Sequence, residues 1–331
     1  MAVVADGSRT GRGSGIRRPP AAKARPTSSL TRRQRLKRDR TLILMMLPGL
    51  AFFLVFQYAG QLGNVIAFKD YIPFMGINGS QWVGLQNFST LFADPAFWHA
   101  FWNSLEVAVL QLVFFFPVPL AVALLLHSLT RGVVRKFVVS VLYLPHFISW
   151  VIVIALFQQV LGATGMLNGL FSDGTGNHHL INVFGDPAMF KPMMIIELIW
   201  KDCGWGTIIF LAALYQVDEQ LYEAAALDGA KPFQRFVHVT LPSIRPVVVL
   251  LLIMRVGDIL SVGFDQVMQQ RDTFGAGASE VIDTYVYYHG VQQGAFSVAT
   301  AAGLFKGVIA AVLVIAANKV AHKFGEQGIY Q

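Results

Sequence analysis

Charged and aromatic side chains interrupt one of the long apolar stretches of the sequence. Glu197, Lys201 and Asp202 lie there together with Trp200 and Trp205. An ionisable group at the centre of a bilayer costs roughly 3 kcal/mol or more, so such groups face protein or water. Carboxylates beside flat indole rings could line a polar path for a hydroxylated solute. The alternative is a structural ion pair, because Glu197 and Lys201 are spaced to meet on one helix face.

Two later apolar stretches also carry ionisable residues. Arg255 and Asp258 lie in one of them, and Lys306 lies in the last. Asp258 is a further candidate for the polar path, although Arg255 and Asp258 could instead neutralise each other and stabilise helix packing. In the first stretch, Gly204 and Gly206 would let their helix approach a neighbour closely.

The sequence contains no convincing set of catalytic or metal-binding residues. The lone Cys203 excludes an internal disulfide and a cysteine-based zinc site. His178 and His179 are adjacent and need not converge, and His146 is predicted to be a membrane-interface residue. A G-x-x-x-x-G-K-[ST] phosphate loop does not occur, so if this protein depends on ATP, the nucleotide must be bound by another chain. We therefore predict no catalytic residue, metal or cofactor in this chain.

The composition is that of a membrane protein. Hydrophobic residues make up 54% of the 331 positions and charged residues 14%, whereas soluble domains have about 25% charged residues. A helix needs about 20 apolar residues to cross the hydrocarbon core. Polar or re-entrant structure in the fourth apolar stretch would change the number of spans. Six stretches qualify and predict an all-α polytopic protein: 42–66, 105–127, 138–161, 192–216, 244–264 and 297–318.

Basic residues predict the orientation, because they collect in cytoplasmic connections. The segments 67–104, 162–191 and 265–296 hold only three of the 26 Lys and Arg residues, and they hold eight acids. These segments are therefore predicted to be external. Both termini are then cytoplasmic, in a multi-pass protein of the cell membrane.

The first 40 residues carry 12 of the 26 basic residues, so the remaining chain is slightly acidic. This distribution argues against nucleic-acid binding and for a disordered cytoplasmic arm that lies on membrane lipid. An export signal at Arg32-Arg33 or an organellar transit peptide is the alternative. The predicted segments are the arm 1–40, a first span with an external loop 41–100, a core 101–318 and a cytoplasmic tail 319–331.

One predicted cytoplasmic connection, 217–243, does not have the composition of a linker. Asp218 is placed to cap a short helix, and Gly229 to end it in a left-handed conformation. Pro232 suits the first turn of a second short helix, and Pro242 would then turn the chain into the fifth span. Two amphipathic helices with a glycine corner suit docking on another protein, or a hairpin that rests on lipid headgroups.

The same connection resembles the EAA motif of permease subunits in binding-protein-dependent type I ABC importers. Val239 stands where this family usually has isoleucine. The resemblance covers most of the chain, with the permease core at roughly 100–320. The residues that carry it are Glu223, Ala224, Ala225, Gly229, Leu241 and Pro242.

Further stretches look like the subgroup that imports complex carbohydrates and oligosaccharides, including polygalacturonan-type and lipoprotein-like sugar systems. The resemblance thus implies a type I permease fold and a sugar or oligosaccharide as substrate. The stretches are Ala67–Tyr71, Val83–Phe88, Tyr143–Trp150 and Ala299–Lys306.

The resemblance also implies partners. An external sugar-binding protein would deliver substrate to a heterodimer of this chain and a second permease, and an ATPase dimer would use ATP to switch the pair between inward- and outward-facing states. In this family the motif forms a coupling helix in a cleft of the ATPase. If these roles apply to this chain, Glu223 makes the polar contact with the ATPase, and Ala224 and Ala225 allow the helix to approach the ATPase closely. Gly229 forms the bend, and the Leu-Pro pair fixes where the loop meets the fifth span.

Two other classes of protein remain as alternatives. An ion-coupled secondary transporter would use Glu197, Asp202 or Asp258 as a proton or sodium site, and its uptake would follow an ion gradient and ignore ATP. A membrane scaffold would recruit a cytoplasmic partner through 217–243 without any solute flux.

Overall fold

The structure is a computed structural model that describes residues 39–129, 132–167, 183–323, 325–326 and 328. Nearly all of the predicted basic arm, and His178 and His179, lie outside these residues. Contacts divide the chain into two units, residues 1–61 and 62–331. The division falls within the predicted segment 41–100.

The described part of the first unit is an apolar helix. Helix α2 (Arg40–Phe53) continues into the π-helix η1 (Leu54–Ala59) and then into α3 (Gly60–Leu62). Every residue from Arg40 to Gln61 is exposed. A helix that is apolar on all sides and buries nothing is suited to lipid, in agreement with the first predicted span.

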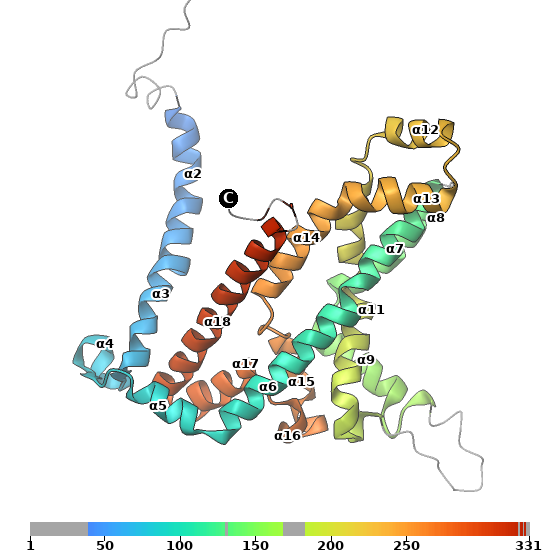
Figure 1. Ribbon diagram of the computed structural model, residues 1–331. Helices are drawn as coiled ribbons and strands as arrows, with labels where there is room; N and C mark the ends of the chain where they lie inside the picture. The colour runs from blue at the N-terminus through green and yellow to red at the C-terminus, as the bar shows by residue number, and fades with distance from the viewer. Residues whose placement is uncertain (1–38, 130–131, 168–182, 324, 327, 329–331) are drawn as a thin grey trace, which may run out of the picture. The chain divides into compact units, whose positions relative to one another are not determined.

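Long helical elements form the frame of the second unit (Figure 1). Proline and π-helical turns subdivide several of them without ending the helix. The elements of this frame are α6 (Pro95–Leu110), η4 (Gln111–Phe115), α7 (Pro117–Ser128), α8 (Gly132–Tyr143), η5 (Leu144–Phe147), α9 (Trp150–Leu161), α11 (Phe190–Leu214), α14 (Leu241–Gly257) and α18 (Phe296–Lys323).

Shorter elements fill the connections. The two short strands pair antiparallel, with Lys69 opposite Trp82. The elements are η2 (Gly63–Phe68), β1 (Lys69–Asp70), η3 (Pro73–Met75), α4 (Gly76–Gly79), β2 (Gln81–Trp82), α5 (Gln86–Ala93), η6 (Val183–Gly185), η7 (Pro187–Met189), α12 (Glu219–Leu227), α13 (Pro232–Arg235), η8 (Phe236–Thr240), α15 (Phe264–Phe274), α16 (Ala276–Ser279), α17 (Ile282–Val286) and η9 (Tyr287–Gln292).

Four helices of the described chain are long and apolar enough to cross a membrane, namely Arg40–Phe68, Pro95–Ser128, Pro232–Gly257 and Phe296–Lys323. They correspond to the first, second, fifth and sixth predicted spans. The fourth predicted span corresponds to α11, a helix of 25 residues. It is not one of these four helices, because its three central charges make it more polar. The all-α class is confirmed, whereas the number of six spans stays a prediction.

The third predicted span, 138–161, is not one straight helix. Gly132–Phe147 and Trp150–Leu161 are bent by 103° relative to each other. Ile148 and Ser149 between them have extended backbones, with ψ values of 137° and 153°. Two extended residues thus break the helix shortly after Pro145, and the predicted span consists of two helices joined at a sharp bend.

Helix α11 packs closely on α7 and α8 through its two glycines. A Cβ atom on Gly204 would lie 2.1 Å from the carbonyl oxygen of Leu142, and one on Gly206 would lie 2.8 Å from Cβ of Pro119. Both distances are shorter than a van der Waals contact. The predicted close approach at Gly204 and Gly206 is thus confirmed, and it fixes where α11 lies against the end of α8.

Helices α15, α16 and α17 form a cap at one end of the second unit, away from α12 (Figure 1). Nδ2 of Asn103 donates to the carbonyl of Glu280 at 2.9 Å, and the amide of Ile282 donates to Oγ of Ser104 at 2.8 Å. The hydroxyl of Tyr285 donates to Asp94 at 2.6 Å, and burial raises the pKa of this Tyr285 phenol. The predicted external segment 265–296 is therefore held on the helix bundle by buried hydrogen bonds.

Candidate functional site

A polar cluster forms where α11 passes the break between α8 and α9. Nδ1 of His146 lies 2.8 Å from Oδ1 of Asp202. Nζ of Lys201 donates to the carbonyl of His146 at 2.7 Å, and it lies 3.9 Å from Asp202. Two neighbouring residues of α11 thus hold both the side chain and the backbone of His146.

Three aromatic rings lie nearly parallel beside this cluster. The rings of His146 and Trp205 have centroids 4.9 Å apart and planes 11° apart. The ring of Tyr143 lies 5.7 Å from that of Trp205, at 17°. The helix break turns His146 toward α11, so this residue has a polar partner that the sequence did not predict. His146 lies in Tyr143–Trp150, a stretch that resembles sugar permeases, and this resemblance was the signal in the sequence that could have marked His146 as a candidate site residue.

Two cavities meet at the His146–Asp202 pair, which lines both of them. One cavity, of about 370 Å³, extends between α7, α11 and α14 and is also lined by Trp205, Arg255 and Asp258. The other, of about 420 Å³, extends toward α9 and α15. The second cavity is lined in addition by Ile148, Ser149, Trp150, Val151, Lys201, Asp265 and Gln269.

The structure brings together three of the five residues predicted for the path, and it places the other two elsewhere. Asp202, Trp205 and Asp258 line the first cavity. Glu197 is fully buried outside both cavities. Trp200 meets the ring of Phe157 edge-on at 5.7 Å and lines neither cavity.

Glu197, Arg255 and Lys306 take side-chain partners from other helices. The carboxylate of Glu197 accepts hydrogen bonds from the side-chain amides of Gln266, at 2.8 Å, and Gln270. Arg255 donates to the side-chain oxygen of Gln111, and Lys306 pairs with Asp283. The alternative of i, i+4 pairing between Glu197 and Lys201 is therefore not what the structure forms.

The first half of segment 217–243 folds as its residues predict. Oδ1 of Asp218 accepts the backbone N–H two residues on, at 2.9 Å, at the start of α12. Gly229 has φ of 75°. The amides of Gly229 and Ala230 donate to the carbonyls of Ala226 and Ala225 at 3.0 and 2.9 Å, which is the glycine-ended C-cap pattern. The predicted cap and glycine corner are confirmed.

The second half differs from the prediction. Instead of a separate short helix, Pro232–Gly257 is one helical stretch that includes α13, η8 and α14. Pro242 lacks an N–H and its ring crowds the preceding turn. The π-helical turn η8 ends two residues before Pro242 and accommodates an extra residue. The predicted turn at Pro242 is therefore wrong, and the chain enters the fifth span without a break.

Helix α12 presents an exposed surface. Glu223 and Ala224 are exposed, and Ala225 is partly buried. Leu227 is 90% exposed. The hydroxyl groups of Tyr222 and Thr240, 3.0 Å apart, tie α12 to η8, and Figure 1 shows α12 beside α13 at one end of the unit. An exposed acid with small and apolar neighbours suits a protein partner.

Replacing Gly229 with alanine is expected to loosen this corner. Nothing lies within 4 Å of the new Cβ atom, so the cost is only that of a left-handed backbone, about 1–2 kcal/mol. Amide hydrogen exchange at positions 229 and 230 should accelerate about 5- to 30-fold. Gly277→Ala, which also adds a Cβ in open space but at an ordinary φ, is the control. Unchanged exchange in Gly229→Ala would contradict the strain argument.

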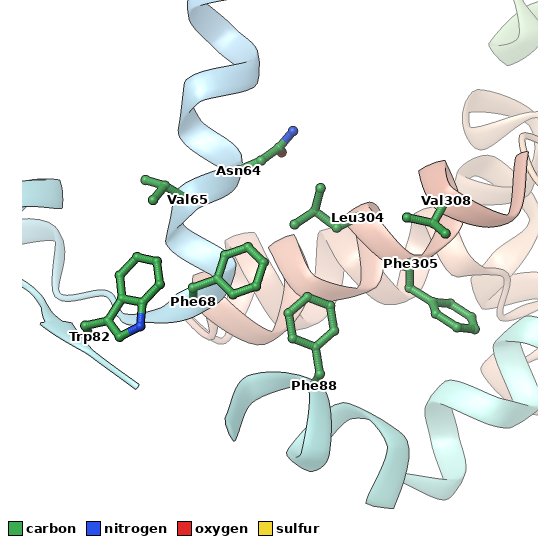
Figure 2. A pocket seen from close by; sticks show the side chains of 8 residues that line it. All are labelled: Asn64, Val65, Phe68, Trp82, Phe88, Leu304, Phe305 and Val308. Carbon is green, nitrogen blue, oxygen red and sulfur yellow. The ribbon is translucent and has the colours of Figure 1, made fainter. Parts of the chain in front are cut away.

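Another cavity, of about 480 Å³, lies between η2 and α18 (Figure 2). Phe68, Trp82, Phe88 and Phe305 contribute rings to its wall, and Asn64 is the one polar residue in its lining. This apolar surface offers a hydroxylated solute almost no hydrogen-bonding group. The two cavities at His146 and Asp202 are therefore the better candidates for a polar path.

Long apolar helices, two cavities with polar groups between them and the exposed helix α12 are features of a multi-pass membrane protein. Residues 115–322 match the family described as "Binding-protein-dependent transport system inner membrane component". The chain belongs to this family.

Two proteins of Bacillus subtilis (strain 168) resemble it along most of both chains. Protein LplB is 44% identical over 296 residues, which cover 89% of this chain and 92% of LplB. The polygalacturonan/rhamnogalacturonan transport system permease protein YteP is 45% identical over 297 residues, with coverages of 89% and 92%.

A solved structure has the same fold. One chain of a bacterial alginate ABC transporter, in complex with an alginate pentasaccharide-bound periplasmic protein, superposes with a TM-score of 0.79 and 36% identity. The match covers 89% of this chain and 98% of that one. The chain is thus a permease subunit of an ABC importer in the cell membrane, as the resemblance implied, and family membership favours this class over an ion-coupled transporter or a scaffold.

Proposed function

We propose that this permease imports an oligosaccharide through the cavities that meet at His146 and Asp202, and that 217–243 couples it to a separate ATPase. The observation that carries the coupling proposal is the exposed Glu223–Ala224 surface of α12. This helix is capped at both ends, so its fold does not require a partner, yet its outer face is left uncovered.

Three features support a sugar as the solute. YteP is named for polygalacturonan and rhamnogalacturonan, and the structural relative is an alginate transporter. The flat ring of Trp205, which lines the first cavity, can pack against the apolar face of a sugar ring. Asp202 and Asp258 can accept hydrogen bonds from sugar hydroxyl groups, which would fix orientation within a mainly apolar cavity.

The His146–Asp202 pair would separate the two cavities in this state. A sugar hydroxyl can replace the imidazole as a donor to Asp202, whereas Lys201 can keep its bond to the backbone of His146. In this proposal the passage opens when α11 and the 148–149 break move apart during ATP-driven switching. The chain itself supplies no catalytic residue and binds no cofactor, and the ATPase binds and hydrolyses ATP.

The proposed assembly contains a second permease, an ATPase dimer and an external sugar-binding protein. Segment 101–318 is the permease core in this proposal, and the arm 1–40 and the tail 319–331 are cytoplasmic. Leu241 and Pro242 place the coupling helix relative to α14.

A pull-down of the solubilised complex tests the coupling role. Wild type should co-purify with an ATPase, a second permease and a binding protein. With Glu223→Ala, the amount of co-purified ATPase should fall more than tenfold, because truncating one partner of a buried charged contact costs about 2–5 kcal/mol. The variant should still insert and retain the second permease.

Glu219→Ala is the matched control, since Glu219 is also an exposed acid of α12. This variant should retain the ATPase. The coupling role is wrong if Glu223→Ala keeps its ATPase and full ATP-dependent uptake.

A further inference from the structure

A cavity of about 670 Å³ lies between α8 and α11, on a different face of α11 from the proposed path. Its lining is polar at one end and mostly aliphatic farther along the two helices. Arg135 and Lys136 lie near the start of α8, and Tyr215 directly follows the last residue of α11. The other lining residues lie farther along these helices and are mostly aliphatic: Val139, Ser140, Ile208, Leu211 and Ala212.

The polar end of this cavity lies at the predicted cytoplasmic boundary of the membrane. The predicted cytoplasmic connection between the second and third spans leads into α8 at this end, and α11 leads from the same end toward α12. The cavity therefore has two cations and a phenol at the membrane surface and an apolar groove that extends toward the hydrocarbon core. An anionic phospholipid has the same arrangement of charge and hydrocarbon.

The two cations lack acidic partners among the described residues. Cζ of Arg135 lies 5.2 Å from the ring centroid of Tyr215, which leaves its N–H groups free for an anion. Five other basic residues of this unit do pair with carboxylates, namely Lys191, Lys201, Arg245, Arg271 and Lys306. Unpaired cations beside an apolar groove at the cytoplasmic leaflet favour an anionic lipid headgroup.

We propose that this cavity binds an anionic phospholipid of the cytoplasmic leaflet. Arg135 and Lys136 hold the phosphate, and one acyl chain lies along Val139, Ile208 and Leu211. The cavity in Figure 2 has no such cation in its lining, so the same argument does not apply there. The proposal rests on the predicted orientation and is independent of the proposed sugar path.

Photocrosslinking in nanodiscs tests the proposal on the complete importer. The probe is phosphatidylglycerol with a diazirine in one acyl chain, and labelled peptides are located by mass spectrometry. Wild type should be labelled within 139–142 and 208–212. Arg135→Gln with Lys136→Gln should lower this labelling by about fivefold for each cation removed. Lys319→Gln with Lys323→Gln removes two other exposed cations from the same predicted side and should have no effect.

A second variant separates the groove from its charges. Ala212 is exposed, so Ala212→Phe should fill the groove without disturbing the core and should reduce labelling at 208–212 while both cations remain. The proposal is overturned if a phosphatidylcholine probe labels these positions as strongly, because the contact is then only that of surrounding lipid. It is also overturned if the double charge variant keeps its label, or if a partner subunit covers 208–212 and wild type is not labelled.

Discussion

Gly204→Ala is expected to destabilise the folded protein strongly. The new Cβ atom would lie 2.1 Å from the carbonyl oxygen of Leu142 and 2.7 Å from the backbone nitrogen of Tyr143. These are backbone atoms of a packed helix, so α8 and α11 would have to separate. Overpacking costs about 1–3 kcal/mol and sometimes more, and we expect the upper end, about 3 kcal/mol. The measurement is thermal unfolding of the detergent-solubilised protein.

Two glycines of α18 provide controls for this experiment. Nothing lies within 4 Å of a Cβ atom on Gly303 or Gly307, and alanine favours helix over glycine by up to about 1 kcal/mol. Both alanine variants should unfold at the wild-type temperature or slightly above it. Wild-type unfolding of Gly204→Ala would mean that α8 and α11 are not in contact. The same contact positions Leu142 and Tyr143 just before His146, so stability and the candidate path depend on one glycine.

Asp202→Ala is expected to lower sugar uptake by about 10- to 100-fold. Asp202 bonds His146 and faces both cavities, and a hydrogen bond to a charged group contributes about 1.5–3 kcal/mol. Because Asp202 is far from α12, ATP hydrolysis stimulated by the binding protein should stay within about twofold of wild type. Uptake and ATP hydrolysis are measured together in proteoliposomes that contain the complete importer.

The controls for Asp202 distinguish the cavities from the rest of α11 and from the outer surface. Asp272→Ala removes an exposed acid that lines neither cavity and should transport normally. Trp205→Ala should impair uptake more than Trp200→Ala, since only Trp205 lines the first cavity. The path is misplaced if Asp202→Ala transports at the wild-type rate, or if the two tryptophan variants rank in the opposite order.

Local sequence determined the features that depend on neighbouring residues. Apolar stretches of spanning length predicted four of the long helices, because burial in hydrocarbon requires only composition and length. Asp218 and Gly229 predicted where α12 begins and ends, because each acts on backbone groups within a few residues. The outline of segment 217–243 could therefore be predicted from its own residues, apart from the continuous helix through Pro242.

Only the tertiary structure decided the partners of the buried charges. Glu197 has Lys201 one turn away, yet it takes Gln266 and Gln270 from α15. His146 joins Asp202 because two extended residues bend the chain by 103° and a glycine lets α11 approach α8. These contacts join residues that are 56 to 73 positions apart. Which side chains meet at that separation depends on how the helices pack, which the spacing of charges along one helix does not specify.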